Sequence, residues 1–194
     1  MSLKLISRVE PVIALESLRR QCKLDAEIKP GNTVATHEDD GLLLDYLAGA
    51  VELAEHQTER AVGTQSLELA LDMFPLNAIA LPKGPAVSVQ AVTYRDEFGV
   101  VQTVDPSGYV LDNRGDQNWL LPAFGVRWPA AQLSANSLVV RYTAGGELPR
   151  AIKLALLLLV ADMYKNPEAT SDKQLQVLPI GVKALLNTQR IWGL

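Results

Sequence analysis

Apolar and polar residues repeat with two different periods along this chain, one typical of helices and one typical of strands. Between residues 37 and 58, Leu43, Leu47 and Ala50 recur every three or four positions, which is the period of one face of an α-helix. A shorter pattern of the same kind covers residues 14–22. The first third of the chain is therefore predicted to be helical.

The helix predicted up to residue 58 has an unusually wide apolar stripe. Thr36 precedes His37 and three carboxylates, so we expect it to cap the helix, with the carboxylates beside the positive end of the helix dipole. Such a broad stripe favours more than one packing partner. The residues that widen it are Leu42, Leu44, Val51 and Leu53.

At Gly63 the period of the pattern changes from about 3.6 to 2, which indicates strands in place of helices. Asp96 and Gly99 enclose a short loop between two apolar runs, as in a hairpin whose glycine takes a positive φ. Short strands separated by proline and glycine are typical of a small antiparallel sandwich or barrel. The predicted strands cover residues 67–71, 78–81, 87–94, 100–104, 109–112, 119–121 and 137–142.

Helical patterns return after Gly145. Pro149 suits the first turn of a helix over residues 150–165, and Pro179 suits that of a last helix over residues 180–189. The centre of the first of these two helices is apolar on almost every side, which predicts deep burial. We therefore expect this helix to be the hub of the fold.

These elements predict an α+β fold with two parts. About four helices from the two ends of the chain, residues 1–62 and 144–194, form a helical core. Residues 63–143 form a small antiparallel β module inserted into that core.

Charge and cysteine content narrow the possible functions. The 194 residues are 48% hydrophobic and 21% charged, with 18 Lys and Arg against 22 Asp and Glu, a net charge of −4. Without a basic block, tight sequence-specific binding of nucleic acid is disfavoured. The single cysteine, Cys22, excludes an intrachain disulfide and a cysteine-based zinc site. The most apolar stretch, residues 154–161, is too short to span a membrane.

Candidate catalytic chemistry is sparse. His56 shares a predicted helix face with Glu52 and Glu59, but no second histidine stands at ligand spacing. His37 is interpreted as a helix-start residue and Cys22 as a small packed hydrophobe. The glycine patterns of phosphate loops and nucleophile elbows are absent from the sequence. We therefore predict no catalytic residue, no metal site and no cofactor.

Two further features have alternative interpretations. The tripeptide from Arg114 to Asp116 matches an adhesion motif, but the surrounding polar residues favour an ordinary turn. Trp192 lies beyond the last predicted helix. It either folds back onto the protein or anchors a partner, because terminal segments are poorly ordered unless something holds them.

Blocks along nearly the whole chain resemble the head-tail connector proteins of tailed bacteriophages and prophages, also called adaptor or head-completion proteins, in the longer form with a β insert. The individual blocks consist mostly of packing and turn residues, and their order and spacing carry the resemblance. The principal blocks are Glu10-Pro11-Val12, Gln65-Ser66-Leu67-Glu68-Leu69, Leu81-Pro82-Lys83, Trp128-Pro129, Val139-Val140-Arg141-Tyr142, Ile152-Lys153, Ala155 to Ala161 with Tyr164, and Leu178-Pro179 with Gly181-Val182.

The resemblance implies a structural virion protein without enzymatic activity. Such a protein forms a ring under the portal of a filled capsid, extends the DNA channel and offers a platform for tail attachment. Its implied partners are copies of itself, the portal protein and the next connector or tail protein. DNA passes through without sequence-specific binding, and no membrane is involved. The implied location is the virion, assembled in the cytoplasm of a bacterial host.

Two sets of residues are candidates for these contacts. We expect the helical core to carry the packing of the ring and the segment after the last helix to reach the portal. The candidates for the contact between subunits are Leu42, Leu44, Val51, Leu53, Arg150 and Lys153. The candidates for the portal contact are Arg190, Ile191, Trp192 and Leu194.

Two alternative functions stay open at the level of sequence. One is a soluble enzyme or small-molecule-binding domain with a site in the β module around Trp119 and Trp128. The other is a different small ring protein that completes the tail.

Overall fold

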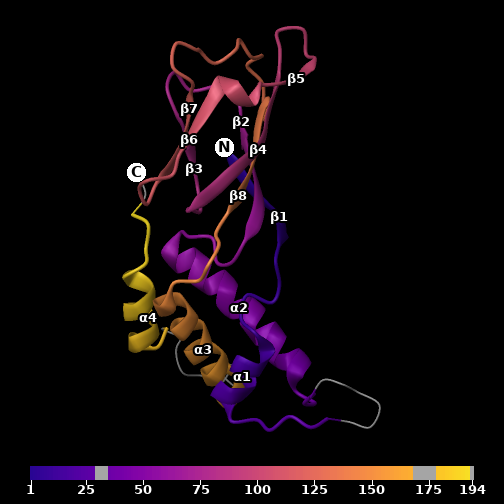
Figure 1. Cartoon of the computed structure of the whole chain (residues 1–194), viewed down its shortest axis with the longest axis vertical. Helices are drawn as coiled ribbons and strands as arrows, with labels where there is room; N and C mark the ends of the chain where they lie inside the picture. The colour runs from indigo at the N-terminus through magenta and orange to yellow at the C-terminus, as the bar shows by residue number, and fades with distance from the viewer. Residues whose placement is uncertain (29–34, 168–177, 193–194) are drawn as a thin grey trace. The chain divides into compact units, whose positions relative to one another are not determined.

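Two compact units make up the chain in the computed structural model, which describes residues 1–28, 35–167 and 178–192. The sheet unit contains residues 1–9 and 59–147 together with Ile191 and Trp192. The helical unit contains residues 10–58 and 148–190. Helices and antiparallel sheets occur together, so the predicted α+β class is confirmed. Figure 1 shows the course of the chain through both units.

The described residues of the helical unit form four α-helices, close to the positions that the apolar period predicted. They are α1 (Leu15–Cys22), α2 (Asp40–Thr58), α3 (Arg150–Lys165) and α4 (Ile180–Asn187). Pro149 and Pro179 each stand directly before a helix, as N-cap residues of α3 and α4. At this position their fixed φ leads into the first turn without the loss of a helical hydrogen bond.

The predicted cap of α2 is wrong. Thr36 forms an isolated antiparallel bridge with Glu27, with N–H···O distances of 2.9 and 3.1 Å. The helix begins at Asp40, whose carboxylate accepts a hydrogen bond of 2.9 Å from the backbone N–H of His37. The local sequence favoured Thr36, but its backbone groups pair instead with a segment nine residues earlier.

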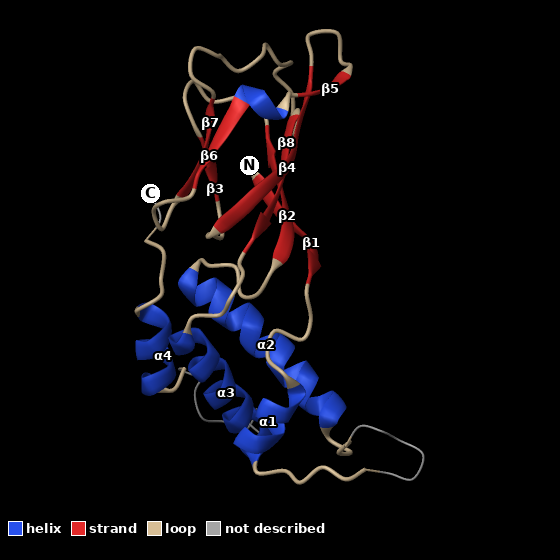
Figure 2. Ribbon diagram, viewed as in Figure 1, coloured by secondary structure: helices blue, strands red, loops and turns tan. Residues whose placement is uncertain are grey.

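The sheet unit contains two antiparallel sheets (Figure 2). The five-stranded sheet has the order β1-β2-β8-β4-β5, and the three-stranded sheet has the order β3-β7-β6. Seven of these strands lie where the two-residue period predicted them. The strands are β1 (Ser2–Arg8), β2 (Gln65–Leu71), β3 (Ile79–Leu81), β4 (Ala86–Arg95), β5 (Val101–Thr103), β6 (Tyr109–Asp112), β7 (Asn118–Pro122) and β8 (Leu138–Ala144).

The first strand differs from the sequence analysis, which assigned residues 1–62 to the helical part. β1 pairs antiparallel with β2, from Ser2 opposite Ala70 to Arg8 opposite Gln65, with a bulge after Leu5. This places residues 1–9 in the sheet unit. The strand is held by a partner some sixty residues away, and no local pattern of seven residues shows such a pairing.

Both sheets contribute to one apolar core in the sheet unit. Leu67, Leu69 and Val140 from the larger sheet and Ile79 and Leu120 from the smaller sheet are almost completely buried in the same cluster. The alternation of buried and exposed positions along β2 and β8 follows from the two-residue period of a strand.

Tyr142 places a hydroxyl group in this apolar core, and the hydroxyl has a hydrogen-bond partner there. Its side chain is fully buried, and its hydroxyl donates a hydrogen bond of 2.7 Å to the carbonyl of Pro82. Burial raises the pKa of this phenol above its usual value. Tyr142 therefore stays neutral and fixes the segment after β3 against β8.

The hairpin between β4 and β5 has the predicted turn. Gly99 has a φ of 79° and donates its N–H to the carbonyl of Asp96. The Asp96 carboxylate accepts the backbone N–H groups of Phe98 and Val100 at 3.0 and 2.9 Å. The side chain of Gln102 donates a third hydrogen bond, and these bonds together lower the pKa of Asp96.

Helix α3 is buried on only part of its surface, which corrects the prediction of burial on all sides. Ile152, Ala155, Leu156 and Leu159 are buried, in a helix that packs on α1, α2 and α4. Leu154 and Leu158, on another face, remain 46% and 37% exposed. The helical unit therefore leaves part of its apolar surface uncovered.

Candidate assembly surfaces

The interface candidates on α2 fall into two groups. Leu42 and Leu44 are exposed, at 42% and 37%. Val51 is buried among the core residues of the chain, and Leu53 is only partly exposed. Leu42 and Leu44 are therefore accessible from outside the chain, whereas Val51 packs within it.

The two turns of α2 that follow Leu44 expose small and acidic side chains. Asp45, Ala48, Gly49 and Glu52 are all exposed, and their spacing of three, four and seven residues places them on one helix face. A Cβ atom added at Gly49 meets nothing within 4 Å. We call these four residues the acidic face.

The interface candidates on α3 belong to a second exposed face. Arg150, Lys153, Leu154 and Leu158 are all exposed, and the intervals of three and four residues between them place them along one side of the helix. The two basic residues were predicted from the sequence and the two leucines were not, because an almost wholly apolar helix gives no signal of which side faces outward. We call these four residues the leucine face.

The candidates for the portal contact lie after α4. Arg190 and Trp192 are exposed, the latter at 73%, while Ile191 is buried in the sheet unit. The side chain of Gln117 donates a hydrogen bond of 3.2 Å to the carbonyl of Trp192. The backbone of Trp192 is thus bound to its own chain while its ring is exposed, and the contact of this ring with a partner stays a prediction. Leu194 lies outside the described residues.

A groove of about 800 Å³ in the sheet unit lies beside Trp128. The indole of Trp128 stacks on Phe74 at 5.0 Å between ring centroids and donates a hydrogen bond to the carbonyl of Asn77. Trp119 is not among the lining residues. The lining consists of Phe74, Pro75, Leu76, Asn77, Leu121, Pro122, Val126, Arg127, Trp128 and Pro129.

The groove carries little catalytic potential. Among these lining residues, all of them in the described part of the chain, Arg127 is the one ionisable side chain. Nucleophilic or general acid-base catalysis typically uses a serine, threonine, cysteine, histidine, lysine, tyrosine or carboxylate within reach of the substrate, and the lining residues include none of these. The groove offers an apolar wall and a guanidinium instead.

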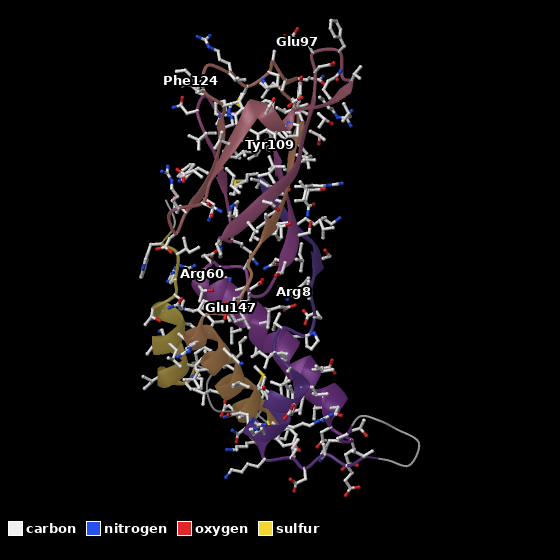
Figure 3. The ribbon with its side chains drawn as sticks, viewed as in Figure 1. Arg8, Arg60, Glu97, Tyr109, Phe124 and Glu147 are labelled. Carbon is white, nitrogen blue, oxygen red and sulfur yellow. The ribbon has the colours of Figure 1, made fainter. Side chains whose placement is uncertain are left out.

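Exposed aromatic residues occur at the loops of the sheet unit. Phe98 and Phe124 are 89% and 106% exposed relative to a reference residue. Figure 3 places Phe124 and Glu97, the neighbour of Phe98, at the same end of this unit. Both rings are therefore accessible to solvent and to other molecules.

The two histidines and the cysteine lie in the helical unit, where His37 and Cys22 are partly buried. The Nδ1 atom of His37 accepts the backbone N–H of Asp39 at 3.1 Å. Burial raises the pKa of the Cys22 thiol, which lowers its fraction of reactive thiolate. His56 is exposed beside Glu52 on α2, whereas Glu59 lies beyond the end of the helix at a φ of 54°. Within the described ranges, no group of three or more His, Cys, Asp or Glu side chains is placed to hold a metal ion.

A cluster of hydrogen bonds joins three helices of this unit. Arg19 donates two hydrogen bonds, of 2.7 and 2.6 Å, to the Asp40 carboxylate. The hydroxyl of Tyr164 donates one of 2.6 Å to Asp39, which raises the pKa of Tyr164 to about 12. The guanidinium of Arg19 holds the pKa of Asp40 below its usual value. These contacts link α1 and α3 to the start of α2.

The adhesion-like tripeptide lies in the connection between β6 and β7, where a turn was predicted. Arg114 is paired with Asp112 at 2.9 Å, and Asp116 is paired with Arg60 at 2.5 Å. Each charged side chain of the tripeptide thus has a partner in its own chain, which fits the turn interpretation.

Comparison with solved structures shows a likeness along the whole chain. A chain titled as the neck of an empty gene transfer agent (GTA) particle, computed with C6 symmetry, superposes with a TM-score of 0.76 at 22% identity. A chain from the virion of the native GTA particle gives 0.76 at 23%, and one from the native neck computed with C12 symmetry gives 0.72 at 24%. In all three cases the alignment covers 100% of this chain and 97% of the other.

At this level of identity the likeness establishes a shared fold. No protein-family model matches the sequence, and no curated protein matches it significantly. In the described part of the chain, no helix has the length and apolar character that crossing a membrane requires.

Proposed function

We propose that this chain is a structural head-tail connector, or adaptor, of a tailed, phage-like particle. It forms a ring under the portal, extends the DNA channel and provides a platform for tail attachment. The observation that carries this proposal is the superposition, over the full length of the chain, on chains from the neck of a symmetric particle.

The surface of the helical unit supports a role in assembly. Leu42 and Leu44 on α2 and Leu154 and Leu158 on α3 are exposed at 37% or more. Exposure of such apolar side chains to water raises the free energy of a monomer. Their burial in a contact between copies lowers it again. A ring gives every copy two such contacts.

The proposal includes the portal as a partner of the C-terminal segment. Trp192 presents an exposed indole after α4, and its backbone is bound to Gln117. Tryptophan is among the residues that contribute most to protein interfaces. A partly fixed position reduces the entropy that such an anchor loses on binding. The net charge of −4 is compatible with a channel that passes DNA without retaining it.

The ring is tested by light scattering and negative-stain electron microscopy of the purified chain at rising concentration, alone and with purified portal. Rings with a central hole in either condition support the connector. A chain that stays monomeric in both conditions contradicts it.

The portal contact is tested separately by deletion of residues 189–194, with Trp192→Ala as the smaller change. We expect both variants to lose docking to the portal while ring formation is retained. Docking that is unchanged in the deletion variant contradicts the portal contact. A ring that binds a tail protein and not the portal instead supports the related role of tail completion.

The groove at Trp128 supports small-molecule binding as a second candidate function. Its stacked Phe74 and Trp128 rings and the Arg127 guanidinium suit a flat anionic compound. The test is a screen of such compounds by the change in tryptophan fluorescence, with Trp128→Phe as the control. A signal that the Trp128→Phe variant loses supports a ligand site.

A further inference from the structure

We propose that the ring is built by a contact between two different helix faces, in which the leucine face of one copy packs on the acidic face of the next copy. The leucine face consists of Arg150, Lys153, Leu154 and Leu158 on α3. The acidic face consists of Asp45, Ala48, Gly49 and Glu52 on α2. This inference rests on the proposed ring and adds which surfaces form it.

The shapes of the two faces are complementary. Arg150, Leu154 and Leu158 follow each other at intervals of four residues and form a ridge of large side chains. Ala48 and Gly49 have almost no side chain, and the space above Gly49 is open to at least 4 Å. Two helices pack when the ridge of one enters a groove of the other. Leu154 and Leu158 therefore fit onto the small residues of α2.

The charges of the two faces are also complementary. The leucine face carries two positive charges, at Arg150 and Lys153, and the acidic face carries two negative charges, at Asp45 and Glu52. In the described part of the chain, none of these four side chains has an ion pair. Opposite charges on facing surfaces fix the orientation of a contact and increase its rate of formation.

The occupant that fits each face is thus another copy of the same chain. Both faces lie apart from the buried positions through which α2 and α3 pack in their own unit, such as Leu47 and Ala155. A contact between two unlike faces leaves one of each kind free on every dimer. Such a contact closes into a ring when the rotation between copies allows it.

The first experiment disables one face at a time. Leu154→Glu removes the ridge and adds a charge of the wrong sign, and Gly49→Leu fills the groove at a position where the monomer has room. Leu133→Glu, at an exposed leucine of the sheet unit, is the matched control. Circular dichroism and thermal unfolding confirm that each variant is folded.

We expect Leu154→Glu and Gly49→Leu each to weaken ring formation about tenfold or more, measured by sedimentation velocity, with the control unchanged. Where the wild type assembles only on the portal, the same measurement uses the ring on the portal. Folded variants that assemble like the wild type overturn the inference and leave the connector function standing. A wild type that forms no ring overturns both.

The second experiment distinguishes two unlike faces from a symmetric contact. In a mixture of Leu154→Glu with Gly49→Leu, each variant keeps one intact face, so the two intact faces form a dimer that cannot grow. We expect a dimer in the mixture and monomers in each sample alone. Monomers in the mixture, in a protein whose wild type forms rings, contradict the contact.

Charge reversal tests which side chains meet. We expect Glu52→Lys and Lys153→Glu to weaken assembly individually, and the double variant, in which both charges are exchanged in every copy, to recover at least part of the loss. If the double variant loses as much assembly as the two single variants added together, the two charges do not lie close to each other, and the charge pairing is overturned. A loss of portal binding in Leu154→Glu with normal rings assigns the leucine face to the portal instead.

Discussion

At the scale of single residues, Arg19 and Asp40 form a largely buried ion pair in the helical unit. Two charge-assisted hydrogen bonds of 2.7 and 2.6 Å join side chains that are only 10% and 18% exposed. When one partner of such a pair is removed, the other keeps its desolvation cost without compensation. The pair therefore matters more for stability than the exposed ion pairs of the same chain.

We predict that Asp40→Asn lowers the free energy of unfolding by about 1.5–3 kcal/mol. Glu16→Gln, which breaks an exposed pair with Arg20 at 2.9 Å, is the matched control and changes it by less than about 1 kcal/mol. Urea unfolding followed by circular dichroism measures both. Equal effects of the two substitutions contradict the role assigned to Asp40.

The same pair predicts a dependence on pH. The pKa of Asp40 is lower in the folded protein than in the unfolded chain, so its contribution is complete above the unfolded value of about 3.9. The contribution is lost as the pH falls through the folded value. The stability difference between wild type and Asp40→Asn is therefore expected to shrink in acid, in urea titrations from neutral pH downward. A difference that grows in acid has the wrong sign for this mechanism.

Gly145 is a second residue with a specific conformational role. Its φ is 87°, and an added Cβ overlaps the carbonyl of Gly63. Gly145→Ala therefore combines a steric clash with the strain of a positive φ, which by itself costs about 1–3 kcal/mol. We expect a larger loss of stability than in Gly125→Ala, where φ is 76° and the space is open. Thermal unfolding of the two variants compares them directly.

At the scale of elements, α3 has one buried and one exposed side, and two leucines close together in the sequence lie on different sides. Leu156 is fully buried, whereas Leu158 is 37% exposed. We predict that Leu156→Ala lowers the free energy of unfolding by about 2–5 kcal/mol because it opens a cavity. Leu158→Ala is expected to change it by less than about 1 kcal/mol, since water already reaches this side chain. Similar losses in a folded monomer contradict the assigned orientation of α3.

The elements were largely predictable because their patterns are local. The helical period over α2 and α3 and the two-residue period over β2, β4 and β8 appear in consecutive residues. β1 was not predicted because its stability comes from pairing with β2, which lies far away in the sequence. The cap at Thr36 was mispredicted for the same reason, since Thr36 pairs with Glu27.

At the scale of the whole molecule, the proposed contact between copies has a predicted dependence on salt. The leucine face carries two positive side chains and the acidic face two negative ones. Salt reduces the range of the electrostatic attraction between them from about 10 Å at 0.1 M to about 3 Å at 1 M. We expect ring assembly to slow and weaken over this range, measured by light scattering after dilution. The Glu52→Lys with Lys153→Glu double variant keeps the same dependence if the charges face each other. Assembly that is indifferent to salt argues against paired charges.

The candidate surfaces were only partly predictable. Leu42, Leu44, Arg150 and Lys153 are exposed, as an interface requires, and their part in a ring remains a prediction. Val51 had the same apolar character but is buried. Composition and period show that a helix has excess apolar surface, and they do not show which neighbour covers each side.

The amino-acid sequence by itself determined the approximate positions of the helices and of most strands, because these depend on the period of apolar side chains over consecutive residues. It also determined the charge balance. Tertiary structure alone decided that residues 2–8 join the sheet, that Ile191 is buried while the Trp192 ring is exposed, and that Leu154 and Leu158 face outward. Each of these depends on contacts between segments far apart in the chain, where the decisive quantity is the surface that another segment covers.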